Sequence, residues 1–272
     1  MNATETKKPC PKSEKLPVLF VGHGSPMNAI EHNDLTDNWR KLGVEMPRPS
    51  AILSISAHWE TKGTQVTVMQ KPPTIHDFGG FPKALFDVQY PADGLPELAY
   101  EIKSIIESEN IELSDRWGLD HGTWSILNHL YPDANIPVVQ LSLDYYKSPQ
   151  QHFDFAKQLT TLRRKGVLIL CSGNIVHNLR MVAWDKMNEP EYGYEWAIEA
   201  NEKVKQLVKA NDFEALVNYI SLGMEMQLAV PTPDHFLPLL YLLAMKEENE
   251  EIEFFNDRLM MGSLSMLSMK LG

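Results

Sequence analysis

Short runs of β-branched and aliphatic residues constrain the fold of this chain more than any other feature of its sequence. Three of them lie at residues 18–21, 52–55 and 167–170, and each is mostly apolar at successive positions. Strands that are buried on both faces show this pattern, because helices cover both sides of a parallel sheet. The sequence therefore predicts an α/β fold with buried parallel strands.

Segments with helical spacing alternate with these strands, which is typical of a layered α/β architecture. The clearest is the amphipathic segment 195–210, and the apolar residues of 96–109 also recur at helical intervals. Further helices are predicted at 34–42, at 120–130 after a loop, around Phe155, Leu159 and Leu162, and at 213–220, with further strands at 51–57, 64–69 and 137–143. The last segments, EIEFF and LMMGSLSML, are consistent with strands, or with a strand and a turn.

The chain is predicted to hold one folded domain after a short tail. Residues 1–15 are polar and lack the apolar centre of a secretory signal, so they are expected to form a flexible N-terminal tail. No repeat, low-complexity linker or change of composition follows, and residues 16–272 are expected to be a single domain. Cys10 in the tail and Cys171 in a predicted buried strand are poorly placed for a disulfide. With no secretory signal, the cytoplasm is the expected location.

Charge and hydropathy argue against several classes of partner. Acidic residues outnumber basic ones 36 to 25, the net charge is −11, and the one basic cluster is Arg163, Arg164 and Lys165. Nucleic acid and anionic membranes are therefore not expected to bind. The longest strongly apolar stretch, 235–245, is much shorter than the roughly 20 residues that a bilayer span requires.

Four histidines lie where a short apolar run gives way to a loop or a turn: His23, His58, His177 and His235. Ligands of open α/β sheets bind beyond the carboxyl ends of the strands, so these side chains are able to converge on one point. Imidazole is the most common protein ligand for transition metals, and a metal site is the leading interpretation. A single histidine is nevertheless more often hydrogen-bonded or exposed, and the motifs HExxH and CxxC are absent.

Other polar residues near these histidines are assigned supporting or incidental roles. A metal-binding imidazole needs a partner for its second ring nitrogen, and the expected partners are Ser25, Ser56, Asn178 and Asp234. Three further histidines are interpreted as solvated surface side chains: His32, His129 and His152.

The segment GLDHGTW places His121 in a polar loop beside an aromatic residue. This histidine is either a substrate-binding or proton-transfer group, or a buried residue hydrogen-bonded to Asp120. The glycine-containing segment 75–82, IHDFGGFP, suits a flexible rim or lid. A serine nucleophile at Ser25 is disfavoured, because the motif G-x-S-x-G is absent and Pro26 follows directly.

Seven segments together resemble a known enzyme family. In order along the chain they are FVGHGSPMNAI, SISAHWET, PPTIHDFGGFP, DHGTW, SGNIVHNL, PTPDHFLPLLY and MGSLSM. The family is the 4,5-DOPA extradiol dioxygenase branch of the class III extradiol ring-cleavage dioxygenases, and the similarity covers nearly the whole chain except the tail. The resemblance implies one catalytic α/β domain with a central mixed, mostly parallel sheet flanked by helices. It also implies a non-haem metal at one edge of that sheet.

The resemblance further implies roles for the histidines of these segments. His23, His58 and His235 correspond to the metal ligands. His177 corresponds to an acid–base residue beside the metal, close enough to be a fourth ligand without substrate, and His121 to a further active-site histidine. The wider family holds Fe(II) with two histidines and one glutamate, whereas the third ligand here is a histidine, and a three-histidine site also suits Zn(II). One divalent metal, Fe(II) or Zn(II), is therefore expected, with O2 as co-substrate.

The substrate that the resemblance implies is a small catechol with a side chain, such as L-DOPA, cleaved at its 4,5 position. Trp59, Phe78, Phe81 and Trp124 are candidates for an aromatic pocket and equally candidates for the core. No arginine or lysine stands out as a carboxylate clamp. Two other functions stay open: a zinc-dependent hydrolase that uses the same histidines to activate water, and a non-catalytic interaction scaffold of the same fold.

Overall fold

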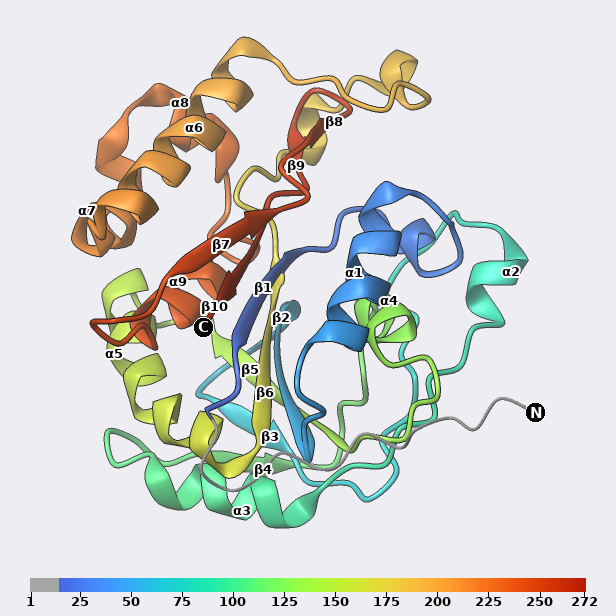
Figure 1. Ribbon diagram of the computed structural model, residues 1–272, viewed down its shortest axis with the longest axis vertical. Coiled ribbons are helices and arrows are strands. Elements are labelled where there is room, and N and C mark those ends of the chain that lie inside the picture. The colour runs from blue at the N-terminus through green and yellow to red at the C-terminus, as the bar shows by residue number, and fades with distance from the viewer. Residues whose placement is uncertain (1–14) are drawn as a thin grey trace.

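The computed structural model describes residues 15–272, which form a single α/β domain around one eight-stranded sheet (Figure 1). The predicted tail, including Cys10, lies outside the described residues except for its last residue, Lys15. The strands, in their order across the sheet, are β4 (Glu112–Ser114), β3 (Gln65–Thr67), β5 (Val138–Asp144), β2 (Ala51–Thr61), β6 (Val167–Gly173), β1 (Val18–Gly22), β10 (Ser268–Leu271) and β7 (Ile252–Phe255).

Four neighbouring strands at the centre of the sheet run parallel, in the order β5, β2, β6 and β1. At one edge β10 pairs antiparallel with β1, and β7 pairs antiparallel with β10. At the other edge β3 is antiparallel to β5 and parallel to β4. The predicted mixed, mostly parallel sheet is therefore confirmed. Every residue of β1, β5 and β6 is buried, as expected of central strands with helices on both faces.

Helices cover both faces of the sheet, and alternate residues of β1 pack into the two layers (Figure 1). Leu19 and Val21 pack with side chains of α1 (Asp34–Glu45) and α4 (His121–Leu130). Val18 and Phe20 belong to the core on the other face. The helices of that face are α3 (Pro96–Ile105), α5 (Pro149–Lys157), α6 (Glu195–Ala210), α7 (Phe213–Val217), α8 (Met224–Ala229) and α9 (Leu237–Ala244), and a short helix, α2 (Lys83–Phe86), follows the loop after β3.

Strand β2 is longer than predicted and contains one of the candidate ligands. The sequence predicted a strand over 51–57, whereas β2 continues to Thr61. Its register with β5 shifts between Ile55 and Glu60, and such an irregularity changes the direction of side chains near the end of a strand. His58 lies within the shifted stretch, beyond the regular part of the strand.

Most other predicted elements are present, with bounds that differ by a few residues. The helix over 195–210 has the predicted bounds. The helix predicted around Phe155 is shorter, because it passes into a 3-10 helix, Gln158–Lys165, which ends at Gly166 with a φ of +77°. The segment 213–220 divides into α7 and the 3-10 helix Tyr219–Leu222. The segments EIEFF and LMMGSLSML contain β7, β8 (Leu259–Met260) and β9 (Leu264–Ser265), whereas β10 follows them and was not predicted.

The basic cluster near residue 164 is engaged in ion pairs. Its members pair with carboxylates on neighbouring segments: Arg163 with Glu250, Arg164 with Glu247 and Lys165 with Glu101. Within residues 15–272, no helix combines the length and the apolar character that crossing a bilayer requires. The strongly apolar stretch noted in the sequence forms α9, which is buried in the core.

Candidate metal centre

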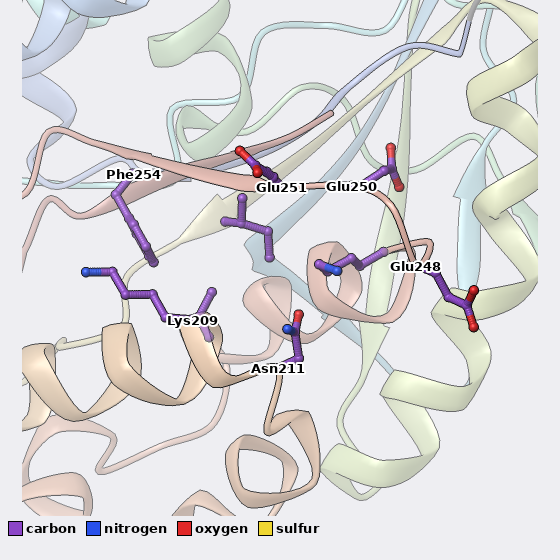
Figure 2. Close-up of a pocket in the computed structure, with 9 residues that line it drawn as sticks. Lys209, Asn211, Glu248, Glu250, Glu251 and Phe254 are labelled. Carbon is purple, nitrogen blue, oxygen red and sulfur yellow. The ribbon is translucent and has the colours of Figure 1, made fainter.

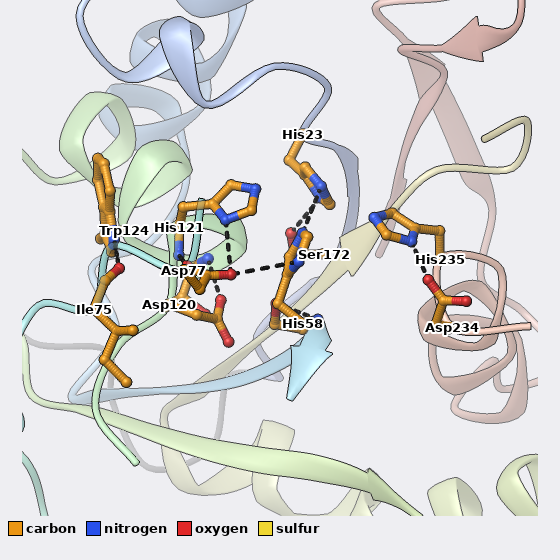
Figure 3. Close-up of polar contacts among 12 residues, drawn as sticks. His23, His58, Ile75, Asp77, Asp120, His121, Trp124, Ser172, Asp234 and His235 are labelled. Carbon is orange, nitrogen blue, oxygen red and sulfur yellow. Dashed lines mark hydrogen bonds and ion pairs between the residues drawn. The ribbon is translucent and has the colours of Figure 1, made fainter. Parts of the chain in front are cut away.

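Three of the predicted histidines converge near the carboxyl ends of the central strands (Figure 3). His23 directly follows β1, His58 lies in the irregular end of β2, and His235 lies in the turn before α9. Each offers one ring nitrogen, and these three atoms lie within 4.8 Å of one another. The Nε2 atoms of His23 and His58 are 3.1 Å apart. Neighbouring nitrogens of a tetrahedral metal site lie roughly 3.3 Å apart, so the cluster needs only small side-chain shifts to share one cation.

Two glycines allow the chain to bring His23 to this point. Gly22 abuts the backbone of Met266, where an added Cβ would lie 2.7 Å from the carbonyl carbon, so a larger residue does not fit. Gly24 has a φ of +62°, which L side chains rarely adopt. The side-chain amide of Asn28 donates to the carbonyl oxygen of His23 at 2.9 Å. Contacts within the protein therefore fix the backbone before and after His23.

His235 has one ring nitrogen with a partner and one without. Its Nδ1 is hydrogen-bonded to the carboxylate of Asp234. Burial acts to raise the pKa of Asp234, but this hydrogen bond and the nearby ring together lower it to about 2, so the carboxylate is charged. The Nε2 of His235 is buried and has no hydrogen-bond partner in the described structure. Buried polar atoms are rarely left unpaired, and an unpaired imidazole nitrogen facing two others fits a metal ion.

The partners of the second ring nitrogens are only partly those that the sequence predicted. Asp234 contacts a histidine ring as expected. Ser25, Ser56 and Asn178 instead accept hydrogen bonds from backbone N–H groups of nearby residues. Ser172, in β6, lies 3.0 Å from the Nδ1 of His23. Sequence analysis missed Ser172 because the contact depends on the register between β1 and β6, which the sequence does not reveal.

Burial favours the neutral form of three imidazoles of the centre, those of His23, His58 and His177. It lowers the pKa of both His23 and His58 well below the ordinary value, and repulsion from neighbouring histidines lowers them further. Burial, and then His235, lower the pKa of His177 to about 3. A neutral imidazole keeps a lone pair for a cation, so this cluster suits a metal ion better than it suits protons.

His177 lies beside the three-histidine cluster. Its ring stacks on that of His235, with centroids 3.5 Å apart and planes 8° apart. It follows β6 by a few residues, and its backbone N–H donates to the carbonyl of Ala229 at 2.9 Å. A group bound at the cluster would lie close to the His177 ring, which is compatible with the acid–base role that stays a prediction.

His121 is the first residue of α4 and joins the cluster next to His58, with ring centroids 3.9 Å apart. Its Nδ1 lies 2.9 Å from Oδ2 of Asp77, and its backbone N–H donates to Oδ1 of Asp77 at 2.9 Å. The alternative of a hydrogen bond to Asp120 is wrong. Asp120 instead caps α4, because its carboxylate accepts a hydrogen bond from the backbone N–H of Thr123 at 3.1 Å.

Asp77 is a second residue of this centre whose role sequence analysis missed. It lies in the segment interpreted as a rim or lid, and its Oδ2 is 3.5 Å from the Nδ1 of His58. His58, Asp77 and His121 therefore form a second group of potential ligands within 4.8 Å. The segment is anchored just before Asp77, where the carbonyl of Ile75 accepts a hydrogen bond from the indole of Trp124 (2.8 Å; Figure 3). The available signal was its place in PPTIHDFGGFP, one of the segments that carry the resemblance.

The interpretation of two other histidines as surface side chains is wrong. His129 and His152 are buried, with 4% and 0% of their surface exposed, whereas His32 is exposed as predicted. His129 lies in α4, where nearly every residue is buried, and His152 lies on the one buried face of α5 together with Phe155 and Ala156. Protein groups contact both ring nitrogens of each: for His129 these are Arg40 and the carbonyl of Asn28, and for His152 the hydroxyl of Tyr241 and the carbonyl of Asp144.

The four aromatic candidates separate into two kinds. Phe78 lies beside the centre, with its ring centroid 5.5 Å from that of His121, and Phe81 packs against Phe78 at 5.3 Å. Trp59 and Trp124 are buried core residues. Phe78 is therefore the aromatic candidate that the structure brings to the histidines.

Two cavities differ in their relation to the centre. One of about 320 Å³ lies between the end of α6 and the start of β7, and none of its lining residues is a histidine (Figure 2). The other, of about 510 Å³, is lined in part by Tyr219, Gln227 and Pro233, and Pro233 directly precedes Asp234 and His235. Neither of these two cavities is lined by a residue of the centre, and the second comes nearest to it along the chain, through Pro233.

Comparisons with known proteins agree with this architecture. The model of the catalytic LigB subunit of aromatic ring-opening dioxygenase matches residues 17–268. The chain is 48% identical over 264 residues to a 4,5-DOPA dioxygenase extradiol of Escherichia coli (strain K12), with 96% of each chain covered. It is 33% identical to a 4,5-DOPA dioxygenase extradiol of Beta vulgaris, over 88% of this chain and 90% of the relative.

A solved structure shows the same fold at high identity. The crystal structure of an uncharacterized protein from Escherichia coli K12 superposes with a TM-score of 0.82 and 41% sequence identity, covering 95% of this chain and 100% of that one. The family match extends over nearly all of the described residues and includes every histidine of the centre. The chain therefore belongs to the LigB family of aromatic ring-opening dioxygenases and is a metal-dependent dioxygenase.

Proposed function

We propose that this chain is an extradiol dioxygenase that cleaves the ring of a catechol, such as L-DOPA at its 4,5 position, at a metal held by His23, His58 and His235. The observation that carries the proposal is the unpartnered Nε2 of His235, a buried atom that faces the ring nitrogens of the other two histidines. The relatives from Escherichia coli and Beta vulgaris bear the name 4,5-DOPA dioxygenase extradiol, which supports the substrate class.

The proposed working metal is Fe(II). Three imidazole ligands suit Fe(II) and Zn(II) alike, so the donor set by itself favours neither ion. Bound Fe(II) would supply the redox chemistry that joins a catechol with O2, whereas Zn(II) has a filled d shell and no redox chemistry. Zinc is thus expected to fill the same site and to give an inactive protein.

His177 is the proposed acid–base residue. Its ring is stacked on His235, so the hydroxyl of a catechol placed at the cluster would lie within reach of its nitrogens. His177 would accept the proton of that hydroxyl and return it to an oxygen of the opened ring. His121, next to His58 and held by Asp77, is proposed to hydrogen-bond the other hydroxyl.

The surroundings of the centre are compatible with a catechol that carries a side chain. Phe78 is placed to pack against an aromatic ring beside His121. The cavity of about 510 Å³ is proposed to accept the side chain of the substrate, because its lining residue Pro233 lies two positions before His235 in the chain. Its lysine, Lys147, is ion-paired with Glu109 and lies 3.9 Å from Asp144, so it is not a free cation for a substrate carboxylate.

The decisive experiment loads metal-free protein with Fe(II) under anaerobic conditions and then adds L-DOPA and O2. We expect oxygen consumption together with a yellow ring-opened product, measured with an oxygen electrode and by absorbance. Protein loaded with Zn(II) is the matched control and should consume no oxygen. A zinc hydrolase would behave in the opposite way, since the zinc form would hydrolyse an ester or amide while the iron form left catechol and O2 unchanged.

A further inference from the structure

One carboxylate oxygen contacts two imidazoles of the centre. Oδ2 of Asp77 lies 2.9 Å from Nδ1 of His121 and 3.5 Å from Nδ1 of His58. The two rings are adjacent, with centroids 3.9 Å apart and planes at 47° (Figure 3). In both rings it is therefore Nδ1 that faces the same acceptor.

Both oxygens of Asp77 are placed to accept hydrogen bonds. One of them, Oδ2, lies 2.9 Å from Nδ1 of His121. The other oxygen, Oδ1, accepts the backbone N–H of His121 at 2.9 Å. A carboxylate requires a proton on the ring nitrogen that donates to it, which is Nδ1 of His121, and Nδ1 of His58 lies near enough to the same oxygen for a small movement to make a second hydrogen bond.

We propose that Asp77 is a positioning residue that holds His58 and His121 in the tautomer with the proton on Nδ1, which leaves Nε2 of both rings as lone-pair donors. The Nε2 of His58 then points to the metal site, where it already lies 3.1 Å from Nε2 of His23. The second nitrogen of His121 points away from Asp77, toward the side on which His23 lies (Figure 3). One carboxylate thus prepares a metal ligand and a substrate-binding group together.

The loop that carries Asp77 also helps to position its carboxylate. The backbone N–H of Ile75 donates to the carbonyl of Leu119 at 2.7 Å, and the ring of His76 bonds the carbonyl of Val88 at 3.0 Å. These contacts fix the chain immediately before Asp77, so the carboxylate is positioned by the backbone as well as by the imidazoles. The segment interpreted from sequence as a rim therefore also holds a metal ligand in place.

The first test reads the tautomers directly in metal-free protein. Proton–nitrogen correlation spectra of protein labelled with ¹⁵N-histidine should show Nδ1–H and unprotonated Nε2 for both His58 and His121. In Asp77→Ala both rings should move toward the Nε2–H form that free imidazole side chains favour. In Asp77→Asn the single amide oxygen should keep Nδ1–H on the nearer ring, His121, and lose it on His58.

The second test measures the affinity for zinc by competition with a chromophoric chelator. Loss of a partner that orients a metal-binding histidine costs on the order of 10–100-fold in affinity, and we expect a loss of this size in Asp77→Ala. His121→Gln should bind zinc almost as well as the wild type, because His121 is not a proposed ligand. The matched control is Asp87→Asn, an exposed carboxylate ten positions further along that pairs with Lys83.

The inference rests on the proposed metal site but not on the proposed reaction, since neither readout needs a catechol or O2. Nδ1–H signals that persist on both rings in Asp77→Ala, with zinc affinity within about twofold of the wild type, would overturn it. A purely structural role would lower the melting temperature of Asp77→Asn and leave the His58 tautomer and the zinc affinity unchanged, which also contradicts the proposal. If Asp77→Ala does not fold, Asp77→Asn provides the same two measurements.

Discussion

The buried histidines of this protein fall into two regions that differ in hydrogen bonding. His129 and His152, on α4 and α5, have protein partners for both ring nitrogens. His235 is almost equally buried, with 7% of its surface exposed, yet its Nε2 has no partner in the described structure. Burial alone therefore does not distinguish a structural histidine from a candidate ligand, whereas the unpartnered ring nitrogen of His235 marks that residue as a candidate ligand.

The largest effect is expected from substitution of His235, the histidine whose buried Nε2 has no partner. His235→Ala should abolish oxygen consumption with L-DOPA and reduce the metal content of the purified protein to background, because one of three proposed ligands is gone. Zinc at 100 times its dissociation constant should raise the free energy of unfolding of the wild type by about 2.7 kcal/mol. It should not stabilise His235→Ala. Normal metal content in this variant would contradict the assignment of His235 as a ligand.

The next effect separates a ligand from the residue stacked on it. His177→Ala should lower the turnover of the iron form on the order of 10²–10⁴-fold, which is typical for loss of a general acid–base group. Its iron content should stay close to that of the wild type, because the three-histidine cluster remains. Full turnover in this variant would remove His177 from the mechanism.

Substitution of a histidine whose two ring nitrogens both have protein partners should lower the stability of the protein and leave its metal binding unchanged. His152→Ala leaves the hydroxyl of Tyr241 and the carbonyl of Asp144 without this partner in the core. We expect a loss of about 3 kcal/mol in the free energy of unfolding, measured with urea. Metal content and stabilisation by zinc should be unchanged. A variant that loses its metal would show that the two regions are coupled.

The last expected effect, which develops only in acid, is a pH dependence of stability. Burial lowers the pKa of His152 from its ordinary value of 6.5 to about 4. Between these values the unfolded chain binds a proton at this position and the folded chain does not, so stability is lost as the pH falls from 6.5 to 4. His152→Gln should remove this contribution, giving a flatter dependence of the unfolding free energy over that range. An equally steep dependence in the variant would assign it to other groups.

The sheet could be predicted from sequence because its central strands leave a strong local signal. The apolar runs at 18–21 and 167–170 became β1 and β6, since strands buried on both faces need apolar residues at nearly every position. The same local reasoning ended β2 too early. The register shift after Ile55 depends on pairing with β5, and no pattern within β2 itself reveals it.

The site was predictable in its residue types but not in its hydrogen bonds. Five histidines named from the sequence lie together in the structure, and the contacts of His121 with Asp77 and of His23 with Ser172 were not anticipated. These contacts join segments that are distant along the chain. Helical periodicity likewise misplaced His129, because nearly every residue of α4 is buried.

The pairing of β1 with β10 joins two distant parts of the chain at the strand that leads to His23. β1 lies beside β10, and the N–H of Gly22 donates to the hydroxyl of Ser268, 246 positions later. Because β6 pairs with the other side of β1, this strand has neighbours on both sides and cannot slide along either without breaking hydrogen bonds. The position of His23 therefore depends on a strand that carries none of the candidate ligands.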